Sequence, residues 1–331
     1  MPPRRWSRRR FGALMLGALA FPACSTGIEK KSAANTRQRG ALRIGAIMYA
    51  RDLEYWQLME AGMREAARRH GVPISVEVSN RQLATEAQLI DTSHARGDNV
   101  LVVAPLDAKA SVAGLRKAHG YGMSIVQIDT RVSDPSFADF VGVSNDTLGT
   151  TIGRAAATYL RTRPNGKGKI ALLTGDTEPN GPVRKKAFLA QVAGAGTVVT
   201  SAEAVGSPEA GSKALETVLQ AHPDIDLVWA WNGAALQGAV TAASRVHAKA
   251  AIFGIDMSAQ VAKAMLAGGS TVKAVADQNA YRIGGQAVDL AVAVARGEKA
   301  NGTPTMPAQL YQDSDAAGLR SFLAGLKKGN P

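Results

Sequence analysis

The chain has 331 residues, of which 46% are hydrophobic and 20% are charged. This composition excludes a disordered or fibrous protein, and the length suffices for one large domain or two ordinary ones. The formal charge of +12 raises the question of a nucleic-acid or anionic membrane partner. Five of the arginines precede Cys24, and residues 29–39 are also basic. The rest of the chain is only mildly basic and requires no polyanionic partner.

The first 23 residues have the features of an export signal. Arginines between positions 4 and 10 precede an apolar run of thirteen residues, Phe11 to Ala23, which is shorter than the roughly 20 residues of a membrane-spanning helix. We therefore predict a signal peptide at 1–23. The segment Ser7-Arg8-Arg9-Arg10-Phe11 resembles the twin-arginine export signature, and Phe21-Pro22-Ala23-Cys24 resembles a bacterial lipoprotein cleavage site.

Cys24 is the chain's single cysteine, so no intramolecular disulfide can form. One interpretation is an unmodified cysteine, but its position at the end of the apolar run favours lipidation, which would attach the protein to a membrane. Residues 24–40 are polar and without hydrophobic periodicity, and we predict that they form a flexible tether. The expected location is periplasmic or otherwise extracytoplasmic, with a lipid anchor if Cys24 is modified.

From residue 41 onward, short β-rich runs alternate with segments of helical periodicity. In the first helical segment Trp56, Met59 and Met63 recur at spacings of three and four, and Gly71 marks its end. The strand candidates are 42–48, 74–78, 100–104, 124–128, 140–143, 169–174, 198–202, 227–231, 251–255 and 272–276. This alternation is typical of α/β proteins with parallel sheets. About eleven strands approach the limit for one open sheet, so we predict two doubly wound lobes.

In such sheets ligands bind at the carboxyl ends of the strands. The residues that follow the predicted strands are rich in carboxylates and carboxamides; they are 49–52, 105–107, 129–131, 144–146, 175–180, Asn232, Asp256 and Gln278. These groups form paired hydrogen bonds with hydroxyls, and Arg184 would add a rigid fork of donors. Tyr55 and Trp56 begin the first helix and could stack on an apolar ligand face. Together these residues predict a site for a small polyhydroxylated molecule.

At these residues the sequence resembles the periplasmic sugar-binding proteins of the ribose-binding type, which are substrate-binding subunits of ABC importers. The resemblance spans about residues 41–310 and rests on short motifs in the family's order. These are the aromatic pair Tyr55-Trp56, Ile125-Val126-Gln127-Ile128-Asp129, Arg184 to Phe188, Ala221-His222-Pro223-Asp224, Leu227 to Asn232, and Gly254-Ile255-Asp256. Each motif is weak alone, but their order and spacing identify the family.

The resemblance implies a type I periplasmic binding protein fold, with two lobes joined by a multi-strand hinge near Val143, Gln278 and Ala308. The first lobe would comprise 41–143 and 279–308, and the second 144–278 and 309–331. The implied ligand contacts are Tyr55, Trp56, Asp129, Arg184, Asn232, Asp256 and Gln278. Tyr49, Thr130 and Trp231 are further candidates. The resemblance also implies a monomer that closes around a sugar or polyol, with the importer's permease and ATPase subunits as partners.

Several positions depart from the pattern of the ribose binders. Ala104 stands where that pattern has asparagine, and Thr130 where it has arginine. At two positions where the pattern has an aromatic residue this chain has Gly206 and Ile255, and Tyr49 stands where the pattern has a small residue. These differences predict a pocket that is not a ribose site.

Several candidate residues also have structural interpretations. Asp129 could be a turn residue or a helix cap. For Asp256 this interpretation is weaker, because Ser258 is the more natural cap of the helix that follows and leaves the aspartate side chain for another partner. Trp229 is expected in the core, and Trp231 in either the core or the pocket wall. Arg184 could belong to a solvated basic cluster with its neighbouring lysines. The five histidines have no metal-ligand spacing.

The sequence contains no nucleophile elbow, phosphate-binding loop or zinc-protease motif, so we expect no enzyme, no cofactor and no metal. Asp129 and Asp256 could in principle form a hydrolytic carboxylate pair, but their amide and arginine neighbours favour binding. The LacI-type regulators share the implied fold but begin with a DNA-binding motif where this chain has an export signal. We therefore predict a protein that captures a sugar or polyol for an ABC importer, or presents it to a membrane sensor.

Overall fold

The computed structural model describes residues 41–298 and 305–327. The predicted signal peptide, the tether and Cys24 lie outside the described residues and stay predictions. Within the described ranges no helix has both the length and the apolar character to cross a membrane.

The first sheet has six strands in the order β11-β5-β4-β3-β1-β2, and every pair in it is parallel. Its strands are β1 Ile44–Met48, β2 Ile74–Val78, β3 Val100–Val103, β4 Ser124–Ile128, β5 Phe140–Val143 and β11 Thr305–Met306. β1, β3 and β5 are fully buried apolar runs, as expected for strands covered on both faces.

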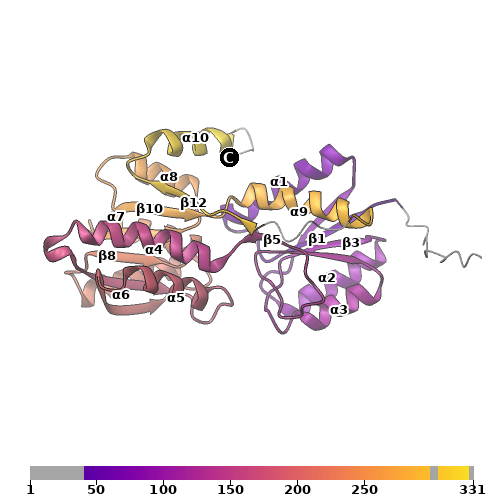
Figure 1. Ribbon diagram of the computed structural model, residues 1–331, viewed down its shortest axis with the longest axis horizontal. Helices are drawn as coiled ribbons and strands as arrows, with labels where there is room; N and C mark the ends of the chain where they lie inside the picture. The colour runs from indigo at the N-terminus through magenta and orange to yellow at the C-terminus, as the bar shows by residue number, and fades with distance from the viewer. Residues whose placement is uncertain (1–40, 299–304, 328–331) are drawn as a thin grey trace, which may run out of the picture. The chain divides into compact units, whose positions relative to one another are not determined.

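Helices cover both faces of this sheet (Figure 1). Helices α1 (Glu54–His70) and α9 (Ala280–Ala295) lie over one face, and α2 (Leu83–Ala95) and α3 (Val112–Gly120) over the other. The apolar stripe that begins at Trp56 is buried, and α1 ends at Gly71 in the left-handed conformation, as predicted. Helices α1 and α9 approach closely at Gly62, because this residue has no side chain. A Cβ there would lie 1.9 Å from the backbone oxygen of Tyr281.

The second sheet also has six strands, in the order β12-β10-β9-β8-β6-β7. They are β6 Gly168–Thr174, β7 Gly196–Glu203, β8 Leu227–Ala230, β9 Ala251–Ile255, β10 Val272–Asp277 and β12 Gln309–Gln312. Its helices are α4 Asn145–Arg161, α5 Gly181–Val192, α6 Pro208–Ala221, α7 Gly233–Arg245, α8 Ala259–Leu266 and α10 Ala316–Lys327. A short 3₁₀ turn, Pro164–Gly166, precedes β6.

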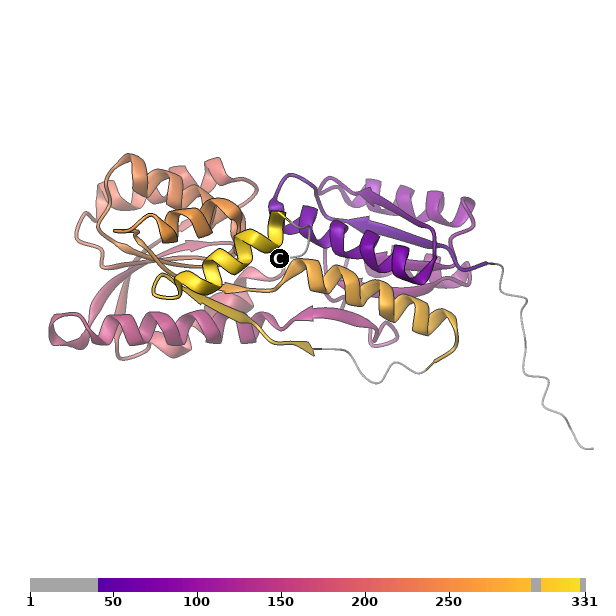
Figure 2. The same cartoon turned by 90° about the horizontal axis from the view of Figure 1, so that it is seen from above.

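The chain passes between the two lobes three times. It leaves the first sheet after β5 to form α4, returns after β10 to form α9, and leaves again between β11 and β12. Figure 2 shows α9 beside α1 on the first lobe, while β12 and α10 belong to the second. The α/β class and the multi-strand hinge are confirmed; the residue limits drawn for the lobes stay a prediction.

Twelve strands occur in the described residues, close to the predicted number of about eleven. The predicted segments did not include β11 and β12, and β12 departs from the parallel pattern because it pairs antiparallel with β10. β11 has only two residues, and in β12 Tyr311 alone is buried, so neither segment has an apolar run to recognise. Two predicted strands also end one residue earlier than expected, which leaves Ala104 and Trp231 just past β3 and β8.

Candidate functional site

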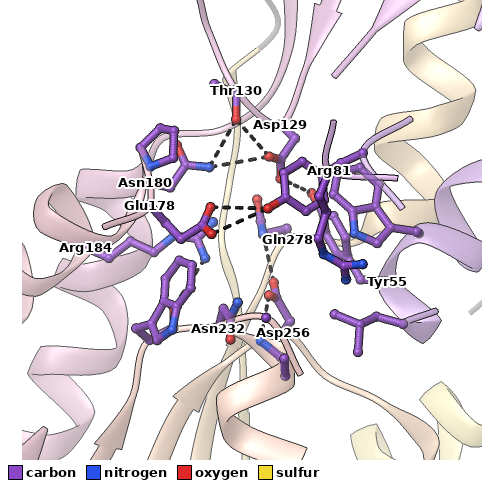
Figure 3. Close-up of a pocket in the computed structure, with 18 of the residues that line it drawn as sticks. Tyr55, Arg81, Asp129, Thr130, Glu178, Asn180, Arg184, Asn232, Asp256 and Gln278 are labelled. Carbon is purple, nitrogen blue, oxygen red and sulfur yellow. Dashed lines mark hydrogen bonds between the residues drawn. The ribbon is translucent and has the colours of Figure 1, made fainter. Parts of the chain in front are cut away.

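A cavity of about 840 Å³, counting the space at its mouth, lies where strands of both sheets end. All ten ligand contacts inferred from the sequence line it: Tyr49, Tyr55, Trp56, Asp129, Thr130, Arg184, Trp231, Asn232, Asp256 and Gln278. Figure 3 shows side chains of the first lobe, such as Tyr55 and Asp129, facing Arg184 and Asn232 of the second. The structure brings the predicted residues together, and their role as ligand contacts stays a prediction.

Aromatic rings form the first lobe's wall. Tyr49 follows β1, and its ring stacks on Trp56 with centroids 5.7 Å apart and planes at 15°. Tyr55 meets Trp56 edge-on at 4.9 Å. Offset and edge-on pairs of this kind add to the energy of burial. The rings therefore fix one another before any ligand arrives.

Asp129 links this wall to the rest of the pocket. It follows β4 with φ at 60°, a left-handed conformation that aspartate tolerates better than most residues. Its carboxylate accepts hydrogen bonds from the hydroxyls of Tyr55 at 2.9 Å and Thr130 at 3.1 Å. Burial, reinforced by the charge of Asp129, raises the pKa of Tyr55 well above its ordinary value. The next element is the strand β5, so Asp129 caps no helix.

Arg184 lies in the first turn of α5 and is 3% exposed. Its Nε donates to Oδ1 of Asn145 at 2.7 Å, and one terminal nitrogen donates to the backbone oxygen of Trp231 at 3.3 Å. Its neighbour Lys185 instead pairs with Asp176 outside the pocket. The interpretation of Arg184 as part of a solvated basic cluster is therefore wrong.

Asp256 follows β9, also with a left-handed φ of 72°. Its two oxygens accept from the backbone N–H of Gly233 at 3.1 Å and from Nε2 of Gln278 at 2.8 Å. Ser258 caps α8 by accepting from the Val261 N–H, as predicted. Burial raises the pKa of Asp256, while the charge of Arg184 acts in the opposite direction. The guanidinium thus stabilises an otherwise costly buried carboxylate.

Behind Asp256 lies a buried carboxyl that the sequence did not single out. Asp277 ends β10 at a crossing between the lobes and accepts from the backbone N–H groups of Met257 and Asn279, both at 2.9 Å. Burial, with a contribution from the charge of Asp256, raises its pKa from 3.8 to about 6. Asp277 lies outside the main pocket and lines a smaller cavity next to it.

Asn232 caps a helix and lines the pocket. It is the N-cap of α7, and its Oδ1 accepts from the Ala235 N–H at 2.9 Å. A capping oxygen satisfies a helix donor that would otherwise lack a partner. The amide NH₂ of Asn232 is then the group that remains for a ligand, so this residue would act as a donor.

Both tryptophans of the 227–231 segment are buried, but only one lines the pocket. Trp229 stacks on Phe188 at 5.0 Å, which confirms its core role. Trp231 lines the cavity, and its Nε1 donates to the backbone oxygen of Ala204 at 2.8 Å. Gly175 leaves room for this ring, because a Cβ there would lie 2.2 Å from the indole.

Several pocket residues were missed as site candidates. Arg81, Glu178 and Asn180 line the cavity, and Asn145 supports Arg184 from outside it. Glu178 and Asn180 fall in the strand-end segment 175–180, so the strand-end rule covered them without selecting them. No sequence pattern indicates which side chains of that loop face the cavity.

The two lobes contact each other around the cavity. The hydroxyl of Tyr49 donates to Glu178 at 3.4 and 3.5 Å, and Nδ2 of Asn180 donates to Asp129 at 3.4 Å. Outside the cavity, the carboxylate of Glu54 accepts from the Ala259 N–H, the first residue of α8, at 3.0 Å. These bonds join the two lobes at the cavity and beside it.

The charged side chains of the pocket form no metal centre. In the part of the chain that the structure describes, no group of three or more histidine, cysteine, aspartate or glutamate side chains could hold a metal ion. The pocket instead combines aromatic rings with hydrogen-bonding side chains on opposite walls, which suits a small organic ligand.

Comparisons with known proteins support this description. The D-ribose/D-allose-binding protein of Pseudomonas aeruginosa is 28% identical over 284 residues, which cover 81% of this chain and 86% of that protein. An ABC transporter solute binding protein from Mycobacterium smegmatis, solved with bound glycerol, is 27% identical, with a TM-score of 0.77 and coverage of 84% and 96%. The fructose binding periplasmic domain of a hybrid two component system shares the fold at 19% identity, with a TM-score of 0.76 and coverage of 87% and 96%.

A family model described as periplasmic binding protein domain matches residues 44–299, most of the chain. This family comprises solute-binding proteins, so the prediction of a binding protein instead of an enzyme is confirmed. The chain belongs to the periplasmic binding protein domain family.

Proposed function

We propose that this protein captures a small sugar or polyol outside the cytoplasm and delivers it to an ABC importer. The observation that carries the proposal is the two-sided pocket, where rings from one lobe face hydrogen-bonding side chains from the other. Flat rings suit the apolar faces of a sugar, and amide, carboxylate and guanidinium groups suit its hydroxyls. The ligands named for the similar proteins from Pseudomonas aeruginosa and Mycobacterium smegmatis, a ribose or allose and glycerol, agree with this class.

The proposed contacts divide between the lobes. Tyr55, Trp56 and Asp129 would hold the ligand on the first lobe, while Arg184 and Asn232 would approach from the second. Asp256 and Gln278 would complete the second side, with Tyr49, Thr130 and Trp231 as pocket walls. A ligand that touches both lobes favours the closed form because its affinity for that form is higher.

A thermal-shift screen tests the binding step. Purified protein would be heated with pentoses, hexoses, polyols and nucleosides, each well above its expected dissociation constant. A ligand at a hundred times that constant stabilises the native state by about 2.7 kcal/mol, which moves the melting temperature by a few degrees. Absence of any shift across the whole screen contradicts sugar or polyol capture.

The delivery step needs a cellular test. Deletion of the gene should abolish uptake of the ligand found in the screen, and genes for a permease and an ATPase should lie nearby. Uptake that continues unchanged after deletion rules out the importer role.

The proposed lipid anchor is tested separately. If Cys24 is lipidated, Cys24→Ala should release the protein from the membrane fraction.

A sensor role is the second candidate. It is favoured by the similarity of fold to the fructose binding periplasmic domain of a hybrid two component system. In that case the closed, ligand-bound form would contact a membrane sensor. Deletion would then abolish a transcriptional or chemotactic response to the ligand and leave its uptake intact.

A further inference from the structure

Negative and positive charges are not equal in number among the side chains that line the pocket. Three are carboxylates, on Asp129, Glu178 and Asp256, and two are guanidinium groups, on Arg81 and Arg184. Arg81 is already paired with Asp52 at 2.6 Å, outside the lining. Among the described residues neither Asp129 nor Glu178 forms an ion pair. The side chains that line the pocket therefore carry an excess of negative formal charge.

The carboxylates differ in how far their hydrogen-bonding capacity is used. Asp129 accepts bonds of 2.9, 3.1 and 3.4 Å, and Asp256 accepts bonds of 2.8 and 3.1 Å. Glu178 accepts from the hydroxyl of Tyr49, and both distances are long, at 3.4 and 3.5 Å. Each carboxylate oxygen can accept two bonds, so Glu178 keeps the most capacity for a ligand.

The positive charge that acts on Glu178, that of Arg81, is already paired with Asp52. Its side chain is half-buried, and burial is the main reason why its pKa is raised. The charge of Arg81 lowers this pKa, while Asp129 and Glu203 raise it further. A cation with N–H groups placed beside Glu178 would stabilise the ionised carboxylate and donate short, charge-assisted hydrogen bonds to it.

Arg184 and Asn232 offer hydrogen-bond donors to the pocket. Arg184 uses two of its five N–H groups on protein acceptors, and Asn232 offers its NH₂. Both groups suit hydroxyl oxygens. The pocket thus offers donors for hydroxyl oxygens on Arg184 and Asn232, and an acceptor for a cation on Glu178.

We propose that the ligand is a small hydroxylated molecule that carries an ammonium group, and that Glu178 selects for that group. This rests on the proposed function, because it names the ligand class of the same pocket. The hydroxyls would contact Arg184 and Asn232, and the ammonium group would contact Glu178.

Isothermal titration with matched pairs tests the proposal. The pairs are D-glucosamine and D-glucose, D-galactosamine and D-galactose, and D-mannosamine and D-mannose, at a pH where the amines are protonated. In at least one pair the amine should bind the wild-type protein about tenfold more tightly than its neutral partner does. This difference in affinity should become smaller at high salt, which screens the interaction between charges. Glu178→Gln should abolish that preference.

Asp176→Asn is the matched control, because Asp176 lies on the same loop, pairs with Lys185 and does not line the pocket. It should keep the preference for the amine. Equal or tighter binding of every neutral partner overturns the ammonium proposal and leaves the proposed function standing. Retention of the preference in Glu178→Gln overturns the role of Glu178. If no pair member binds, the ammonium proposal fails, and the broader screen of neutral ligands then decides the proposed function alone.

Discussion

The two walls of the pocket are built from different chemistry. On the first lobe Tyr49, Tyr55 and Trp56 contact one another, so that wall is stabilised by the same ring packing that stabilises a core. On the second lobe Arg184 and Asp256 are buried and held by hydrogen bonds. The raised pKa of Asp256 shows the energetic cost of that burial. Ring packing thus stabilises the first wall, on which Asp129 is the charged group, whereas the second wall buries a guanidinium and a carboxylate at some cost in stability.

The largest effect is expected on the polar wall. Arg184→Ala removes a buried guanidinium that stabilises Asp256, so it should weaken binding of the ligand found in the screen by about 3–5 kcal/mol. Trp56→Phe keeps a ring on the opposite wall and should change the dissociation constant only a few-fold. Titration calorimetry measures both, with circular dichroism to check the fold. Equal losses in the two variants would remove the distinction between the walls.

A second test concerns the cost of the buried carboxyls. The pKa of Asp277 is raised to about 6, so the native state binds this proton more tightly than the unfolded state does. Its contribution to stability is therefore present at acidic pH and is lost as the pH rises from about 4 through about 6, by about 3 kcal/mol in all. Asp277→Asn does not titrate. In denaturant unfolding, the stability of the wild type relative to this variant should fall over that pH range.

A constant difference between the wild type and Asp277→Asn from pH 4 to pH 7 would contradict this reading of Asp277. The loss of one acceptor oxygen in the variant affects all pH values alike, so it does not imitate the expected slope.

A third test addresses the contact that joins the lobes outside the cavity. Glu54 accepts from the first N–H of α8, where a negative charge is favourable. Glu54→Gln should cost the closed form about 1 kcal/mol and speed ligand dissociation several-fold in stopped-flow measurements. Glu65→Gln, on the exposed side of the same helix, should not. Unchanged dissociation in Glu54→Gln would mean that this bond does not hold the closed form.

The smallest effect is expected for Tyr49→Phe. This variant loses the long bond to Glu178 and keeps the stack on Trp56. Affinity for a neutral sugar should change by less than about 1 kcal/mol, measured by calorimetry. A larger loss would show that the hydroxyl of Tyr49, and not its ring, carries the contribution of that residue.

The sequence was sufficient to predict where functional side chains gather, because parallel strands end at a common edge. Asp129, Asn232 and Asp256 follow three such strands and meet in one cavity. It was not sufficient to predict their partners. The capping bond of Asn232 depends on the path of α7, and the burial of Arg184 depends on Asn145 and Trp231, which are distant in sequence. β12 escaped prediction because an edge strand with one buried residue has no hydrophobic pattern.

Gly175 has a consequence beyond its own position. Any side chain there would collide with the indole of Trp231 and displace it or the adjacent backbone. The width of the cavity is therefore controlled by a residue that is not among those lining it. A redesign limited to the residues that line the cavity would leave Gly175 out. A single methyl group added at this position, behind the indole, would narrow the range of ligands that fit the cavity.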